Sequence, residues 1–169
     1  MLKNRITNIL RKEIVKDKYD KFIFLCIGTR EITGDAIGPT VGDILTDKLK
    51  KDNIIILGNK YKELNYININ NELKQELKKY KLPYIITIDS ALSENEYEGS
   101  IIINREYLGI GTALNKSKII IGNLNIKAIT GKNYNDLEKN IKSIKIYSKK
   151  LINDMANNIA MQIINSFCN

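Results

Sequence analysis

Histidine is missing from this chain of 169 residues. Its absence excludes Ser-His-Asp and Cys-His catalysis, imidazole general bases and every metal site that needs a histidine ligand. Proton transfer near neutral pH would therefore fall to carboxylates, lysine, tyrosine or cysteine. If the chain is an enzyme, its acidic residues are the first candidates.

Cysteine and long apolar segments are also scarce. The two cysteines, Cys26 in an expected buried strand and Cys168 next to the last position, indicate free thiols in an intracellular chain. No apolar run approaches the roughly 18 residues of a membrane span. The first twenty residues are charged throughout and lack a signal-peptide core. We therefore expect a cytoplasmic protein without membrane contact.

Positive charge is in excess, with a net charge of +8. Such an excess would favour binding to nucleic-acid phosphates. The lysines, however, are spread at helical spacing among apolar residues in segments 47–51, 73–81 and 139–150. This spacing is typical of solvated helix faces, and the chain has no zinc-finger or aromatic RNA-binding signature. We expect no nucleic-acid partner.

The hydrophobic pattern predicts one α/β domain over residues 1–169. Helices are expected at 2–16, 39–49 and 70–80, and strands at 21–28, 53–58 and 84–89. This alternation is typical of a three-layer α/β/α sandwich with a mostly parallel central sheet. Strands at 99–104 and 117–130 follow without a helix between them, which predicts a mixed or antiparallel portion. Residues 135–167 are predicted to be helical for most of their length.

Two acids lie where such a fold places its sites. Asp35 follows the first predicted strand, and Asp89 ends the third in "ITIDSA". Sites in open α/β sheets form beyond the carboxyl ends of strands, so the two carboxylates are expected to meet there. Crowded like charges push one pKa up, so that one group can act as acid while the other acts as base. The alternatives are that Asp35 caps the following helix and that Asp89 is structural. Asp43 is expected to be a solvated surface acid.

Glycines surround Asp35 and recur in a second loop. Their conformational freedom would admit a peptide backbone near the acid, and their amides could bind an oxyanion. The first loop ends neither as a P-loop nor as a dinucleotide fingerprint, which argues against nucleotide chemistry. The residues expected to line a substrate cleft are Gly28, Thr29, Gly34, Gly38, Ser90, Gly109, Gly111 and Thr112.

Three segments carry a resemblance to a known family. "FLCIGTREITGDAIGPTVGDIL" (24–45) resembles the opening motif of the YyaC-type sporulation proteins. "YIITIDSAL" (84–92) and "EYLGIGTALNKSKIIIGNLNIKAIT" (106–130) are similar to that family's second and third segments. The resemblance spans roughly residues 20–165 and implies a spore protease.

That family in turn resembles the germination protease, an atypical aspartic peptidase that degrades small acid-soluble spore proteins. It also resembles the hydrogenase-maturation endopeptidases, which implies a phosphorylase/hydrolase-like fold. The germination protease's catalytic acids fall on Asp35 and Asp89. The resemblance thus implies a two-aspartate peptidase of the cytoplasm, forespore or spore core, with a protein or peptide substrate and no cofactor.

Departures from the family leave other interpretations open. The "TREI" loop (29–32) follows the family less closely than its flanks, and "LGIGTALN" (108–115) lacks a common proline. These changes are compatible with an inactive binding or assembly protein on the same scaffold. In the hydrogenase peptidases the two acid positions act with a histidine in nickel recognition. The lack of histidine argues against nickel-dependent recognition here. A homo-oligomer stays open.

Overall fold

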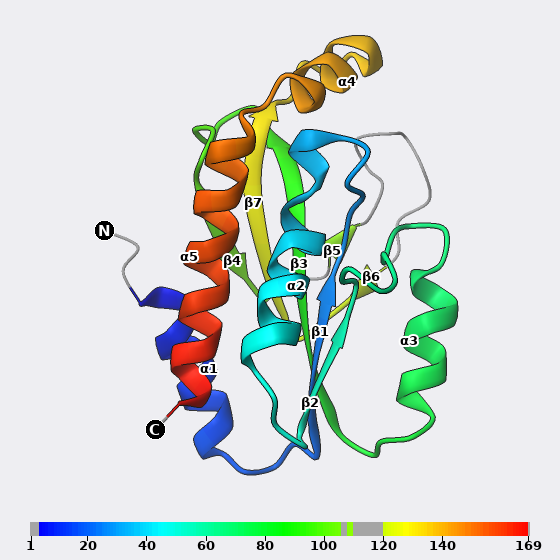
Figure 1. Cartoon of the computed structure of the whole chain (residues 1–169), viewed down its shortest axis with the longest axis vertical. Coiled ribbons are helices and arrows are strands. Elements are labelled where there is room, and N and C mark those ends of the chain that lie inside the picture. The colour runs from blue at the N-terminus through cyan, green and yellow to red at the C-terminus, as the bar shows by residue number, and fades with distance from the viewer. Residues whose placement is uncertain (1–3, 106–107, 110–119, 169) are drawn as a thin grey trace.

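The computed structural model describes residues 4–105, 108–109 and 120–168 (Figure 1). Helices and strands alternate in the first half of the chain, as the sequence predicts. In chain order the elements are α1 (Arg5–Val15), β1 (Lys21–Cys26), the short 3-10 helix η1 (Thr33–Asp35), α2 (Ile37–Lys48), β2 (Ile54–Leu57), α3 (Ile69–Leu77), β3 (Pro83–Ser93), β4 (Ile101–Asn104), β5 (Leu108–Gly109), β6 (Ile120–Ile121), β7 (Leu124–Lys132), α4 (Leu137–Lys145) and α5 (Lys149–Phe167).

The central sheet has five strands in the order β2-β1-β3-β7-β4. β1 runs parallel to both β2 and β3, and β3 runs parallel to β7. β4 lies antiparallel to β7 at one edge. The prediction of a mostly parallel sheet with an antiparallel portion is therefore confirmed. The short strands β5 and β6 pair with each other in a separate two-stranded sheet.

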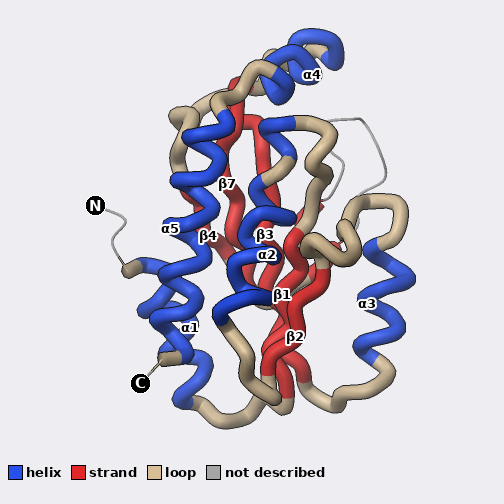
Figure 2. The backbone as a smooth tube through the Cα atoms, in the orientation of Figure 1, coloured by secondary structure: helices blue, strands red, loops and turns tan. Residues whose placement is uncertain are grey.

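Helices cover both faces of this sheet, which gives the predicted three layers (Figures 1 and 2). Alternate residues of β1 face opposite layers, as in any strand. Phe24 and Cys26 pack in the larger core with α1, α2 and α5. Leu25 and Ile27 pack in a smaller core with Ile69 and neighbouring residues of α3. A strand buried on both faces has no polar alternation, which explains the continuous apolar run at 21–28.

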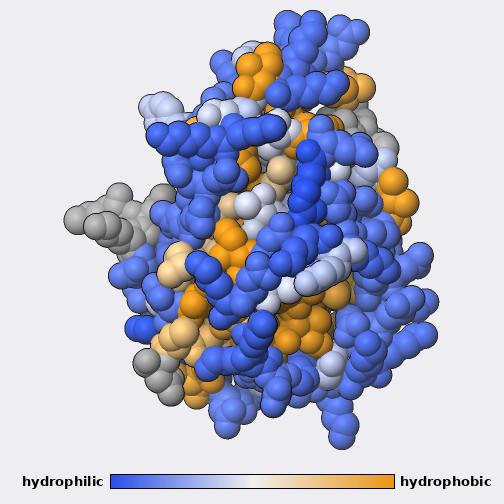
Figure 3. All heavy atoms as spheres, in the orientation of Figure 1, coloured by the Kyte–Doolittle hydropathy of each residue, from blue (hydrophilic) through white to orange (hydrophobic). Residues whose placement is uncertain are grey.

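The outer surface carries the polar residues of the helices. Figure 3 shows hydrophilic side chains over most of the face that bears α2, α3 and α5. In the part of the chain that the structure describes, none of the helices is both long and apolar enough to cross a membrane. Cys26 is buried and Cys168 is exposed, and both are free thiols, as the sequence indicates.

One strand boundary is wrong in the sequence prediction, and it affects the site. Asp89 does not end its strand, because β3 continues to Ser93. The extension has a partner: β7 pairs with β3 as far as Ser93 and Lys132, past an irregularity between Ala91 and Leu92. On its other side β3 loses its neighbour earlier, since the pairing with β1 ends at Cys26 and Ile88. Asp89 therefore lies just beyond the end of β1.

Candidate active site

The carboxyl ends of β1 and β3 form a topological switch point. From β1 the chain passes through α2 to β2 at the edge of the sheet, and from β2 it returns through α3 to β3 on the other side of β1. The two helices pack in different cores on opposite faces of the sheet. Ligands of open α/β sheets bind beyond the strand ends at such a reversal of strand order. Both candidate acids lie at this place.

Asp35 is fixed by two donors from its own chain. Its Oδ2 accepts a 3.1 Å hydrogen bond from the backbone N–H of Thr29, and its Oδ1 accepts a 2.8 Å bond from the hydroxyl of Ser90. The N-cap of α2 is Ala36, and no side chain caps that helix terminus. Asp35 is therefore not a helix cap. It bridges the loop after β1 to the strand β3.

The position of Asp35 depends on Gly28. This glycine has φ +141, a conformation that L side chains rarely adopt. A Cβ at Gly28 would overlap the carbonyl oxygen of Asp35. The absence of a side chain thus lets the turn after β1 lie directly against η1. The structure therefore explains this glycine by the close approach of two segments of the chain.

Burial raises the pKa of Asp35 to about 6. The hydrogen bonds from Ser90 and Thr29 favour the ionised form and limit the increase, whereas the negative charge of Glu63 adds to it. A carboxyl group with this pKa is mostly ionised at pH 7 but is a much better proton acceptor than an exposed aspartate. It has the protonation state that a general base requires.

Asp89 has a pKa well above its usual range. Burial is the main cause and the charge of Asp35 is the second, while the backbone N–H of Ser90 and the charge of Lys127 act in the opposite direction. Asp89 and Lys127 are register partners on β3 and β7. A carboxyl group with a raised pKa keeps its proton to a higher pH than an ordinary aspartate and can then donate it.

The charges of the two acids interact, and Ser90, which follows Asp89, contacts Asp35. Side chains alternate along a strand, so Ser90 faces Asp35 while Asp89 lies on the other face of β3. Among the hydrogen bonds of the described residues, none joins the two carboxyl groups directly. Burial raises the pKa of both groups, and the charge of Asp35 raises that of Asp89 further.

The other predicted cleft residues have different surroundings. Gly34 packs against Ile144 of α4, and a Cβ at Gly38 would overlap the backbone of Ile27. Both glycines therefore permit close packing inside the chain. Gly109 belongs to β5, where it pairs with Ile120. Gly111 and Thr112 lie outside the described residues. A contact between a substrate and any of these residues stays a prediction.

The amides of the loop after β1 are already engaged. Gly28 N–H donates to Leu64, Thr29 N–H to Asp35, Arg30 N–H to Glu63, and the following N–H donates to Thr29 Oγ. The expectation that this loop presents free amides to an oxyanion is therefore wrong for residues 28–31. These amides build the loop instead.

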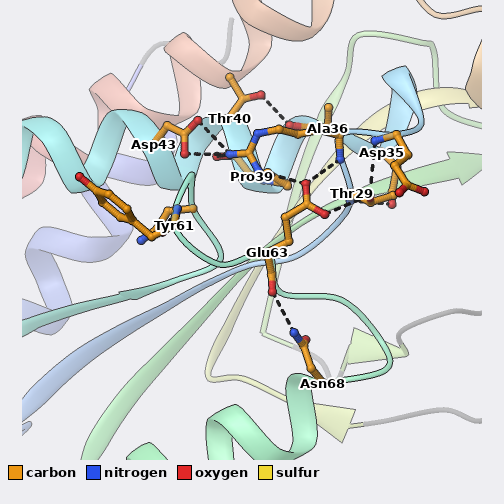
Figure 4. A network of polar contacts seen from close by, with 12 residues as sticks. Thr29, Asp35, Ala36, Pro39, Thr40, Asp43, Tyr61, Glu63 and Asn68 are labelled. Atoms are coloured by element: carbon orange, nitrogen blue, oxygen red, sulfur yellow. Dashed lines mark hydrogen bonds and ion pairs between the residues drawn. The ribbon is translucent and has the colours of Figure 1, made fainter.

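Sequence reasoning missed an ionic network beside Asp35 (Figure 4). Arg30 contacts both Glu63, at 3.1 Å, and Asp43, at 2.8 Å. Asp43 is thus ion-paired and not merely solvated. Glu63 also accepts a hydrogen bond from the hydroxyl of Thr29. The only sequence signal was the departure of the "TREI" loop from its family pattern, because the three charged residues are far apart in the chain.

A metal centre would need several ligands in one place. Within residues 4–105, 108–109 and 120–168, no group of three or more His, Cys, Asp or Glu side chains is arranged to hold a metal ion.

The fold is similar to that of a [NiFe] hydrogenase maturation protease, HycI from Thermococcus kodakarensis KOD1. The TM-score is 0.66 and the sequence identity 16%, and the match covers 95% of this chain and 99% of that one. At this identity the likeness establishes the α/β fold.

Sequence comparison identifies two further similarities. The family model described as "Protein of unknown function (DUF1256)" matches residues 1–162. The protein described as "Uncharacterized protein YyaC", from Bacillus subtilis (strain 168), is 27% identical over 125 residues. That match covers 74% of this chain and 60% of the relative, so the chain spans less than two thirds of the relative's length. The YyaC-type resemblance that the motifs indicate is confirmed.

Proposed function

We propose, from the premise that the chain belongs to the family described as "Protein of unknown function (DUF1256)", that it is an aspartic-type endopeptidase. Asp35 would act as the general base and Asp89 as the general acid. One observation carries the proposal: two acids at the switch point have pKa values raised to different extents, one to about 6 and the other well above its usual range. The protease-like fold is consistent with it.

The reaction follows from the two protonation states. Ionised Asp35 takes a proton from a water molecule, whose oxygen forms a bond to the carbonyl carbon of the scissile peptide. The tetrahedral intermediate then collapses as the C–N bond breaks, and Asp89 gives its proton to the leaving amine. The products are a carboxylic acid and an amine. A proton passed from Asp35 back to Asp89 restores the starting state.

In this proposal the Lys127 side chain supplies the positive charge near the developing oxyanion. The loop amides of residues 28–31 are engaged, so they are not free donors. Lys127 lies opposite Asp89 in the sheet and already acts on its pKa. A positive charge there would favour the negative oxygen of the intermediate.

The substrate is proposed to be a protein, and the family resemblance favours small acid-soluble spore proteins. The same resemblance favours a role in sporulation, in the cytoplasm of the forespore or spore core.

The direct test is incubation of the purified protein with acid-soluble spore proteins, followed by mass spectrometry of the fragments. We expect cleavage by the wild type and a loss of about 10²–10⁴-fold in Asp35→Asn and Asp89→Asn, the usual contribution of a general acid or base. Asp47→Asn is the matched control, because Asp47 is an exposed acid that pairs with Lys60. Cleavage by Asp35→Asn at the wild-type rate would exclude the mechanism.

A second candidate is a non-catalytic binding or assembly protein on the same scaffold. It is favoured by one observation: both carboxylate oxygens of Asp35 already accept hydrogen bonds from the chain, as in a structural acid. This candidate predicts no fragments from any substrate but saturable binding of a peptide, measured by calorimetry. The same purified protein serves both assays.

A further inference from the structure

Glu63 joins the loop after β1 to the segment between β2 and α3. Its Oε2 accepts a 3.1 Å hydrogen bond from Thr29 Oγ. Its Oε1 accepts bonds from the backbone N–H of Arg30, at 3.0 Å, and from Arg30 Nη1, at 3.1 Å. Figure 4 shows Glu63 extending toward Thr29, with Asp35 on the other side of that residue. One carboxylate thus holds two consecutive residues of the loop.

Arg30 ties the same loop to α2. Its Nη2 donates to both carboxylate oxygens of Asp43, at 2.8 and 2.9 Å, and to the carbonyl oxygen of Pro39, at 3.2 Å. The guanidinium is therefore shared between α2 and Glu63. Because its charged group is planar and has several fixed donors, arginine can hold two acids in a defined geometry. The loop is therefore held both by α2 and by Glu63.

The contacts form a continuous path from Glu63 to the proposed base. Glu63 holds the Thr29 side chain, and the Thr29 backbone N–H donates to Asp35 Oδ2. Ser90 holds the other oxygen of Asp35. If the Thr29 peptide rotates, Asp35 loses one of the two donors that orient it. The position of the Asp35 carboxylate therefore depends on a residue that does not contact it.

We propose that Glu63 is a positioning residue for Asp35, acting through Thr29 and held in place by Arg30. The expected effect on kcat rests on the proposed peptidase function. The expected effects on amide exchange and on the pKa of Asp35 do not. Glu63 itself contacts neither Asp35 nor Asp89 through a hydrogen bond in the part of the chain described.

Stability alone does not account for this network. The ion-pairing side chains of Arg30, Asp43 and Glu63 are each about one-third exposed, at 36%, 31% and 33%. Ion pairs this exposed contribute only about 0–1 kcal/mol to folding. A displacement of the base by about 1 Å, in contrast, can reduce a catalysed rate about 10²-fold. The larger effect of the network is therefore expected on geometry.

Charge supports the same assignment. The bonds from Arg30 and Thr29 outweigh the effect of burial and hold the pKa of Glu63 below its usual value, so Glu63 is ionised at neutral pH. Its charge contributes to the raised pKa of Asp35. Ser90 of β3 and Thr29 of the loop face Asp35 and donate to it, and the charges of Asp35 and Asp89 interact although Asp89 lies on the other face of β3. Removal of the Glu63 charge alone would lower the pKa of Asp35, whereas loss of the Thr29 N–H bond would raise it.

Three variants and one control test the proposal. Glu63→Gln keeps the size of the side chain but removes its charge. Thr29→Val removes the hydroxyl, and Thr29→Ser restores it. Glu72→Gln is the matched control, because Glu72 pairs with Lys62 close to Glu63 in sequence but has no contact with the Thr29 loop. Thermal unfolding of each protein shows whether it is folded.

Two measurements need no substrate. Amide hydrogen exchange reports whether the Thr29 N–H keeps its bond to Asp35, and carbon NMR of the carboxyl groups gives the pKa of Asp35. We expect Thr29 exchange to become at least about tenfold faster in Glu63→Gln and Thr29→Val, since local opening becomes easier. Exchange should return to the wild-type rate in Thr29→Ser and be unchanged in Glu72→Gln. The pKa of Asp35 should rise in Thr29→Val, which keeps the Glu63 charge but weakens the bond from the Thr29 N–H.

Fragment production from acid-soluble spore proteins gives the catalytic readout. We expect a loss of about 10–100-fold in kcat for Glu63→Gln and Thr29→Val, and recovery in Thr29→Ser. Thr29 exchange at the wild-type rate in both Glu63→Gln and Thr29→Val would overturn the proposal. If the wild type produces no fragments, the peptidase function fails, and the exchange and titration results still decide whether Glu63 positions Asp35.

Discussion

Ser90 donates a 2.8 Å hydrogen bond to Asp35 across a sequence separation of 55 residues. The bond joins β3 to the short helix that precedes α2. Because Ser90 directly follows Asp89, two consecutive positions of β3 supply the partner of the proposed base and the proposed acid. The relation between the two acids is therefore set by the backbone of β3.

The pH dependence of peptide cleavage should be bell-shaped. Protonation of Asp35, whose pKa is raised to about 6, removes the base on the acidic side. Deprotonation of Asp89 removes the acid on the alkaline side, at a pH well above the usual range of an aspartate. The measurement is kcat/KM against pH, which reports the groups of the free enzyme. A rate that does not change between pH 5 and about 7 contradicts this assignment.

Ser90→Ala should move the acidic limb to higher pH. The Ser90 hydroxyl stabilises ionised Asp35 and lowers its pKa, so its removal should raise that pKa further. At pH 6 the variant should therefore lose more activity than it loses at pH 8. Ser148→Ala is a suitable control, because Ser148 is exposed at the start of α5 and its side chain makes no capping bond. If the acidic limb of the pH profile lies at the same pH in Ser90→Ala and Ser148→Ala, the result would argue against the Ser90 contact.

Asp35→Asn should become more stable than the wild type as pH rises. The pKa of Asp35 increases from 3.8 to about 6 on folding, so its contribution to stability is complete below 3.8 and is lost as pH rises through 6. Asparagine has no charge to bury, and the difference should approach ~2–3 kcal/mol at pH 8. Urea unfolding at pH 4 and 8 measures it.

Asp47→Asn should show the opposite change of stability with pH in the same unfolding experiment. The hydrogen bond from Lys60 holds the pKa of Asp47 below its usual value, so its contribution appears as pH rises and is lost in acid. The substitution should therefore cost stability at pH 8 but not at low pH. If Asp35→Asn shows the same difference from wild type at pH 4 and pH 8, the raised pKa of Asp35 is wrong.

Gly38→Ala should destabilise the fold strongly. A methyl group at this position overlaps the backbone of Ile27, which cannot move without displacing β1. We expect a loss of about 3 kcal/mol or more in the free energy of unfolding. Gly99→Ala is the comparison, because it has open space around it but φ +86, and should cost only about 1 kcal/mol. Similar costs for both variants would contradict the packing role of Gly38.

Only one thiol should react in the folded protein. Cys168 is exposed, whereas Cys26 is buried and burial raises the pKa of its thiol far above the usual value. A thiol-reactive dye should therefore label one cysteine per chain at pH 8, and both after denaturation. Peptide mapping identifies the labelled residue. Rapid native labelling of Cys26 would show that the core around β1 opens.

The layers of the fold and the location of both acids were predictable from local pattern. The apolar run at 21–28 indicates a strand buried on both faces, and acids just after such strands fall at one edge of the sheet. The length of β3 was not predictable, because it depends on pairing with β7. Glu63 was missed for a similar reason: its contacts with Thr29 and Arg30 depend on the fold bringing the segment after β2 beside the loop after β1, which no spacing in the sequence encodes.

The central place of β1 in the sheet also affects how the chain is made. β1 pairs with β2 on one side and with residues 83–88 on the other, so it leaves the ribosome long before its second partner exists. Until then, an apolar strand with an open edge is available to the same strand of another nascent chain. Fragments that stop before Pro83 are therefore expected to aggregate, and a chaperone that shields this edge would increase the yield of folded protein.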